Sequence, residues 1–241
     1  MKTFIALIIL ALSFSAQAES SLALEKADVD VFELESVRRG AGYFVDYCMS
    51  CHSIKHLRYS RLGRDLKMAE ADLRKDVMPD GAKIHESLLT ALDPEDAVKW
   101  FGVAPPDLSL VARARGANWL YSYLKGFYVD PSPSRPTGVN NAFFKDVAMP
   151  NVFWDLQGLQ KPVYTTHDGS QVLELLENMG GGKMSPKEFD QAMLDLVNFL
   201  VYAAEPAQYD RLRLGKYVIF FLLILAVILF KLKKEYWKDI K

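Results

Sequence analysis

The chain contains only two cysteines, and they lie three residues apart in the segment Cys48-Met49-Ser50-Cys51-His52. This spacing, with a histidine directly after the second cysteine, is typical of the attachment site of a c-type haem. Residues at i and i+3 of a helical turn point the same way, so both thiols can form thioethers with one edge of a porphyrin. The following histidine can then give its imidazole to the iron. The sequence therefore predicts one covalent haem c, held by Cys48 and Cys51, with His52 as an axial ligand.

Two other kinds of site use similar residues, and both are less favoured. A structural zinc site needs four ligands. Outside the segment the chain has no further cysteine, and its remaining histidines are His56, His85 and His167. A thioredoxin-like redox pair does not require a histidine after the second cysteine.

The second axial ligand decides whether such a haem carries electrons or reacts with small molecules. A methionine opposite the histidine fills the sixth position, whereas an open position favours ligand binding or catalysis. Met149 precedes Pro150 in an aromatic-rich loop, and a residue before proline is conformationally restricted. Met184, just before the last predicted helix of the domain, is the runner-up, so the residues alone give Met149 only a modest lead. The methionines after the attachment segment are Met68, Met78, Met149, Met179, Met184 and Met193.

The N-terminus has the composition of a secretory signal. Met1-Lys2 precedes a short apolar run from Phe4 to Leu12, and Ala16-Gln17-Ala18 offers a small-residue cleavage site. We expect residues 1–18 to be a signal peptide and residues 19–210 to be a haem domain exported to the periplasm. That domain holds 20 basic and 28 acidic residues, a net charge of about −8, which would favour the encounter with a cationic partner.

The C-terminus contains a second apolar segment. Residues 217–230 carry no charge, and although this run is shorter than the ~20 residues that span a bilayer, flanking lysines can snorkel from its ends. A basic tail with Tyr236 and Trp237 follows, as is typical of a cytoplasmic flank. We therefore expect residues 211–241 to form a transmembrane anchor with a short cytoplasmic tail, which places the protein in the inner membrane as a single-pass protein.

Two predicted helices would position the haem. The first covers residues 37–47, with Gly40 eight residues and Phe44 four residues before the first cysteine of the attachment segment. The second covers residues 186–204 and opens with a capping box formed by Ser185 and Glu188. A close crossing of these two helices at Gly40 is expected for a class I cytochrome c. The predicted fold is thus mainly α, a class I cytochrome c-like haem domain with a single C-terminal transmembrane helix.

The segment between these helices yields weaker expectations. The paired prolines exclude a helix before Asp107, which is a plausible N-cap for a helix that follows it. Residues 118–128 are expected to form an aromatic-rich helix, and residues 130–138 a loop. Basic residues soon after the attachment segment could meet haem propionates, although a solvated helix face is the default for most of them; they are Arg58, Arg61 and Arg64.

Several further motifs decide the family. On them the chain resembles the cytochrome c1 family, the haem-bearing subunits of the cytochrome bc1 complex (quinol–cytochrome c oxidoreductase), from about Val37 to the C-terminus. The resemblance implies that Met149 is the methionine ligand and that Arg115 lies near a haem propionate. The motifs are Arg38-Arg39-Gly40, the attachment segment, Pro105-Pro106-Asp107-Leu108-Ser109, Arg113-Ala114-Arg115, Ala148-Met149-Pro150, Met184-Ser185 and Ala204-Glu205-Pro206.

The resemblance also implies an electron relay. A Rieske iron–sulfur subunit would deliver one electron to this haem, and a soluble or membrane-bound cytochrome c would accept it. Cytochrome b and membrane lipid are further implied partners, no nucleic acid is expected, and the chain would not be catalytic alone. The alternatives are a membrane-anchored cytochrome c of an oxidase or other respiratory complex, a haem peroxidase or gas-binding protein, and a structural protein without haem.

Overall fold

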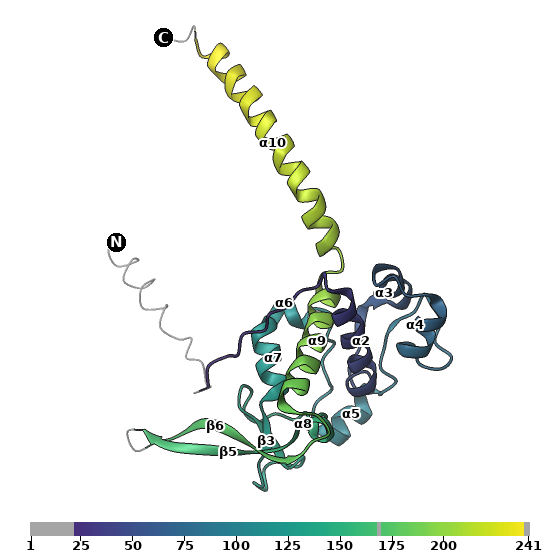
Figure 1. The fold of residues 1–241 in the computed structure, drawn as a ribbon, viewed down its shortest axis with the longest axis vertical. Helices are drawn as coiled ribbons and strands as arrows, with labels where there is room; N and C mark the ends of the chain where they lie inside the picture. Colours follow the sequence, from purple (N-terminus) through teal and green to yellow (C-terminus); the bar gives the residue numbers. More distant parts are fainter. Residues whose placement is uncertain (1–21, 168–169, 239–241) are drawn as a thin grey trace.

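The computed structural model describes residues 22–167 and 170–238, so the predicted signal peptide lies outside the described residues. Figure 1 shows a mainly helical body from which one long helix extends. The helices are α2 (Leu34–Tyr47), α3 (Tyr59–Asp65), α4 (Glu70–Asp76), α5 (Pro94–Phe101), α6 (Val111–Arg115), α7 (Ala117–Lys125), α8 (Trp154–Gln157), α9 (Pro186–Ala204) and α10 (Gln208–Tyr236). The strands form three antiparallel pairs: β1 (Ile54–Arg58) with β2 (Ser87–Leu88), β3 (Phe127–Val129) with β4 (Val139–Asn141), and β5 (Gly158–His167) with β6 (Ser170–Gly181).

Helices α2 and α9 cross at the centre of the body (Figure 1). At Gly40 the two backbones are so close that an added Cβ would lie 2.0 Å from the Asp195 carbonyl oxygen. Phe44 packs beside this crossing against Phe199, with ring centroids 5.5 Å apart. The predicted close crossing is confirmed, and α2 begins three residues earlier than expected.

The crossing is reinforced by polar contacts to a buried carboxylate on α9. Asp195 accepts hydrogen bonds from the Ser36 hydroxyl at 2.6 Å and from Arg39 Nε at 2.6 Å. Burying a carboxylate is costly unless it is paired and hydrogen-bonded. The predicted capping box at the start of α9 is also present: the Ser185 hydroxyl and the Glu188 carboxylate satisfy each other's backbone N–H groups.

Two local expectations were wrong. Asp107 does not cap α6, which begins after Leu110 without a side-chain cap. Its carboxylate instead accepts from the backbone N–H groups of Lys55 and Ser109, both at 3.0 Å, because a short acidic side chain can satisfy nearby turns as readily as a helix end. The predicted 118–128 helix ends at residue 125, and the three residues of β3 pair with β4.

A long β-hairpin formed by β5 and β6 was not anticipated from the sequence. It extends from the body at the end far from α10 (Figure 1). The hairpin does not change the fold class, which remains mainly helical.

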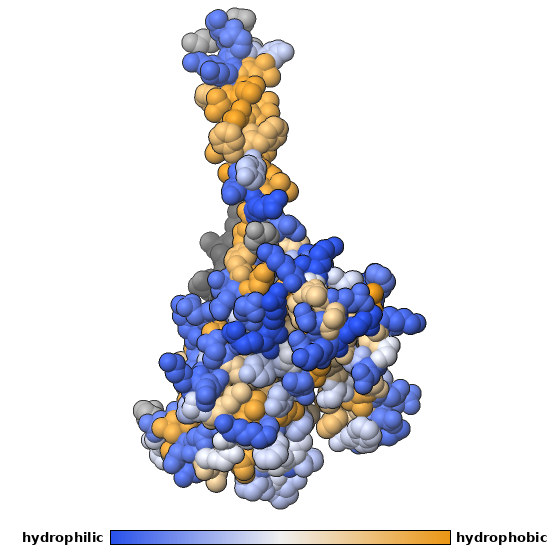
Figure 2. All heavy atoms as spheres, turned by 45° about the vertical axis from the view of Figure 1, so that its right-hand side comes forward, coloured by the Kyte–Doolittle hydropathy of each residue, from blue (hydrophilic) through white to orange (hydrophobic). Residues whose placement is uncertain are grey.

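Helix α10 is longer than the uncharged apolar run at residues 217–230. It contains 29 residues, or about 43 Å at 1.5 Å per residue, which exceeds the ~30 Å of a bilayer core. Residues Asp210–Tyr236 include a window of mean hydropathy 2.3, none of it buried in the body. Figure 2 shows hydrophobic residues along this helix and hydrophilic residues toward its far end. The helix therefore has the length and composition of a membrane span.

Candidate haem site

One apolar cavity of about 350 Å³ brings the predicted site residues together. Cys48, Cys51, His52, Arg115 and Met149 all line it, although they come from three separate parts of the chain. Its volume lies within the ~300–1,000 Å³ typical of cofactor pockets. The rest of the wall is mostly apolar and includes Phe101, Pro105, Leu120, Leu124, Val147 and Leu200.

The attachment segment forms a tight turn at the end of α2. The backbone N–H groups of Cys51 and His52 both donate to the Cys48 carbonyl, at 3.0 and 2.8 Å. This turn places both sulfur-bearing side chains and the imidazole on the wall of the same cavity. Such an arrangement fits a porphyrin held by two thioethers on one edge and by a histidine on one face.

His52 is oriented by the Pro106 carbonyl. Its Nδ1 lies 2.7 Å from that oxygen, and because a carbonyl only accepts, Nδ1 carries the proton. Nε2 is then the unprotonated nitrogen, as a metal ligand requires. Burial lowers the pKa of His52 against the opposing effect of the Pro106 contact, which favours the neutral imidazole. The bond from Leu108 N to the Ser53 carbonyl, 2.8 Å, holds the Pro106 segment against the attachment turn.

The cysteine environment opposes the zinc and redox alternatives. Both thiols are free, and burial raises the pKa of Cys48 to about 12. A reactive redox pair depends on a lowered thiol pKa. Within the described part of the chain, no cluster of three or more histidine, cysteine or acidic residues could hold a metal ion.

Met149 is held at the cavity wall by an aromatic contact that sequence reasoning missed. The Tyr123 hydroxyl donates to the Met149 sulfur at 3.4 Å. Tyr123 in turn stacks on Trp119, with centroids 4.8 Å apart, and burial raises its pKa strongly, so the phenol stays protonated as a donor. Met149 also packs against a small second core of Phe127, Val139 and Val147.

The other methionine candidates, all of them among the described residues, do not line this cavity. Met184, the runner-up from the sequence, packs against the main core and donates its backbone N–H to the Leu156 carbonyl at 3.0 Å. Met193 is fully buried within α9. Among the methionine candidates, only Met149 therefore reaches the cavity that contains His52.

Arg115 supplies a cation at the same wall. Its guanidinium carbon lies 4.8 Å from the Trp119 ring centroid and 5.9 Å from that of Phe144. No ion pair to Arg115 forms among residues 22–167 and 170–238. An arginine without a carboxylate partner beside an apolar cavity fits a ligand that brings its own carboxylates.

The basic residues considered earlier for the same role lie elsewhere. Arg58, Arg61 and Arg64 do not line the cavity. Arg61 and Arg64 pair with Asp65, and Arg61 also donates to the Pro206 carbonyl at 3.0 Å.

The chain was compared with known protein families, and the sequence profile of the Cytochrome C1 family matches residues 25–240. The chain belongs to the cytochrome c1 family. A relative named cytochrome c1 from Allochromatium vinosum is 44% identical over 243 residues, covering 100% of this chain and 98% of the relative. A relative from Nitrosomonas europaea, named ammonia monooxygenase gamma subunit, is 42% identical and covers 100% and 99%. A relative from Candida albicans, named cytochrome b-c1 complex catalytic subunit, is 27% identical and covers 88% and 74%.

Membership of the cytochrome c1 family indicates which cofactor the cavity would hold. The family implies electron transport, a covalent haem c and a membrane anchor. The chain has the two cysteines that attachment requires, and α10 has the character of the anchor.

Proposed function

We propose that this chain is the haem-bearing electron-transfer subunit of a quinol–cytochrome c oxidoreductase. It would pass one electron at a time from a Rieske iron–sulfur subunit to a periplasmic cytochrome c. The observation that supports this most strongly is the meeting of Cys48, Cys51, His52 and Met149 around one apolar cavity. Haem c, when bound, supplies a reversible one-electron iron couple.

The chain's own residues would fix the cofactor and tune it. Cys48 and Cys51 would hold the porphyrin edge, and His52 would offer Nε2 while the Pro106 carbonyl keeps Nδ1 protonated. Met149, which lines the same cavity, would offer its sulfur as the second protein ligand, while the Tyr123 hydroxyl donates to that sulfur. Methionine–histidine ligation raises the reduction potential of a haem, and an apolar wall limits solvent access and tunes it further.

Arg115 would meet a haem propionate. Its guanidinium already stacks on Trp119 and lacks an ion-pair partner within the described segments. A bidentate contact to a carboxylate would satisfy it and would place a fixed positive charge near the iron.

The composition of the two terminal segments supports a division of the chain into three parts. We infer that residues 1–18 are a cleaved signal, that residues 19–210 form the periplasmic haem domain, and that residues 211–241 anchor it in the inner membrane with a cytoplasmic C-terminus. The basic residues after α10's apolar stretch support this orientation. The name of the Candida albicans relative supports assembly with a cytochrome b.

A reduced-minus-oxidised absorption spectrum of membranes, followed by purification through a tag on this chain, tests the proposal. We expect a c-type haem signal that copurifies with a b-type haem and an iron–sulfur protein. Copurification with an oxidase instead would overturn the proposal, and so would copurification with ammonia monooxygenase subunits, as the name of the Nitrosomonas europaea relative would suggest.

A further inference from the structure

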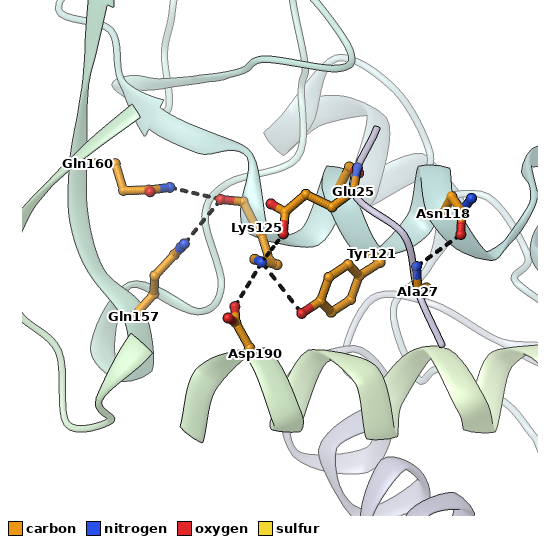
Figure 3. A network of polar contacts seen from close by, with 9 residues as sticks. Glu25, Ala27, Asn118, Tyr121, Lys125, Gln157, Gln160 and Asp190 are labelled. Atoms are coloured by element: carbon orange, nitrogen blue, oxygen red, sulfur yellow. Dashed lines mark hydrogen bonds and ion pairs between the residues drawn. The ribbon is translucent and has the colours of Figure 1, made fainter. Parts of the chain in front are cut away.

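An extended N-terminal segment lies across α7 and continues to α9. We call residues 24–30 the strap. The backbone N–H of Glu25 donates to the Ser122 hydroxyl at 2.8 Å. The backbone N–H of Ala27 donates to the Asn118 side-chain oxygen at 2.9 Å (Figure 3). Farther along, the N–H of Asp30 donates to the Asn198 side chain on α9 at 2.8 Å. The strap is therefore fastened by side chains of two helices.

Helix α7 depends on such external contacts. It has only nine residues and no side-chain cap at its N-terminus, and helices this short are marginal in isolation. Its last residue, Lys125, pairs with Glu25 of the strap and, at 2.8 Å, with Asp190 of α9 (Figure 3). These partners outweigh the opposing effect of burial and raise the pKa of Lys125 to about 12, so the side chain stays charged.

The end of α7 is also fixed through its backbone. The Lys125 carbonyl accepts from the side-chain amides of Gln157 at 3.0 Å and Gln160 at 2.8 Å (Figure 3). The strap thus holds the first two turns of α7 and, through Glu25, its last residue, which α8, α9 and the start of β5 also hold.

The same short helix carries the aromatic residues behind the proposed iron ligand. Trp119 directly follows Asn118 and Tyr123 directly follows Ser122, so the strap-binding stripe and the cavity-facing stripe are neighbours on one helix. Trp119 and Tyr123 line the cavity, and the Tyr123 hydroxyl contacts the Met149 sulfur at 3.4 Å. Any displacement of the first turns of α7 would therefore move the group that supports this sulfur.

We propose that the strap is a clamp for the sixth ligand, with Asn118 and Ser122 as positioning residues that act on Met149 through Tyr123. The inference rests on the proposed function, in which Met149 ligates the iron. It assigns to the strap a role in keeping the methionine–iron bond intact.

The test is a titration of the oxidised, full-length haem protein with imidazole, followed by absorption. Imidazole binds only the form in which Met149 has left the iron, so its apparent affinity measures how often that bond opens. We expect Asn118→Leu to raise this affinity roughly tenfold, equivalent to about 1.4 kcal/mol. This change is of the size expected when a partly buried N–H loses its acceptor.

Two matched variants separate the clamp from general damage. Asn118→Asp keeps an acceptor oxygen for the Ala27 N–H and should bind imidazole within about twofold of the unmodified protein. Lys26→Ala removes an exposed strap residue whose ammonium, within the described part of the chain, pairs only with Asp28, and it should also leave the affinity within about twofold. Hydrogen exchange of the α7 amides gives a second readout, and faster exchange is expected in Asn118→Leu alone.

An imidazole affinity that is unchanged in Asn118→Leu would overturn the clamp, whether or not the α7 amides exchange faster. Met149→Leu checks the underlying ligand separately, because it should bind imidazole more tightly than any strap variant. Equal affinity in Met149→Leu and the unmodified protein would instead refute Met149 as the ligand, and with it the methionine–histidine ligation within the proposed function.

Discussion

Replacing Gly40 with alanine probes the helix crossing that supports the haem segment. The added methyl carbon would lie 2.0 Å from the Asp195 carbonyl oxygen, 2.6 Å from its carbonyl carbon and 2.8 Å from Phe199 Cβ. None of these atoms belongs to the far end of a flexible side chain, so no rotamer change relieves the overlap. Helices α2 and α9 must separate, which also disturbs the hydrogen bonds to the buried Asp195 carboxylate.

The expected loss of stability is large for a single methyl group. Overpacking of a well-packed core costs about 1–3 kcal/mol, and contact with a rigid backbone places this site at the upper end. The better helix propensity of alanine returns up to about 1 kcal/mol, so a net loss of about 2 kcal/mol remains. For a domain of this size the loss corresponds to a fall in Tm of about 4–8 °C.

Gly42 provides a matched control in the same helix. A Cβ at Gly42 would meet nothing within 4 Å, so Gly42→Ala should gain up to about 1 kcal/mol from helix propensity alone. Both variants can be compared as the full-length haem protein in detergent, by circular dichroism and haem absorption during heating. A Gly40→Ala protein that melts with or above Gly42→Ala would refute the proposed close contact.

Three further predictions concern the haem site. Cys51→Ser should leave at most one thioether, so a pyridine haemochrome spectrum of the variant that still shows two would disprove the attachment scheme. Tyr123→Phe removes the hydroxyl 3.4 Å from the Met149 sulfur and should lower the midpoint potential by about 20–60 mV. This range is the loss of a hydrogen bond of about 0.5–1.5 kcal/mol, converted at about 59 mV per tenfold change in the equilibrium constant of a one-electron couple. An unchanged potential would show that the contact does not tune the iron. Arg115→Gln removes a cation that favours the electron-rich reduced state and should also lower the midpoint in redox titration, whereas a rise would contradict its placement beside a propionate.

The features that the sequence predicted well are local or depend on a single residue type. The attachment turn is built within five residues, and the α9 capping box within four. Gly40 could be located because its spacing to Cys48 and its missing side chain point to one close helix contact. The apolar length of α10 likewise follows from composition alone.

The features that were missed depend on contacts between distant residues. The Tyr123–Met149 contact spans 26 residues, and the strap bonds to Ser122 and Asn118 span 97 and 91. Each of these bonds involves a single side chain and a group far away in the sequence, so no periodic sequence pattern indicates it. The β5–β6 hairpin was missed because its register is set by pairing between two strands, one of which contains Pro162. Asp107 was misassigned because a turn and a helix cap use the same acceptor chemistry.

We propose that Met149, together with His52, completes the axial ligation of a methionine–histidine haem. Redox titration of Met149→Leu beside the unmodified protein, with two thioethers verified in each, tests this claim most directly. Loss of the methionine sulfur as an axial ligand should lower the midpoint potential by on the order of 100 mV or more, since axial ligands set haem potentials over a range of about 0.8 V. A midpoint that does not move while the haem remains attached would contradict the claim.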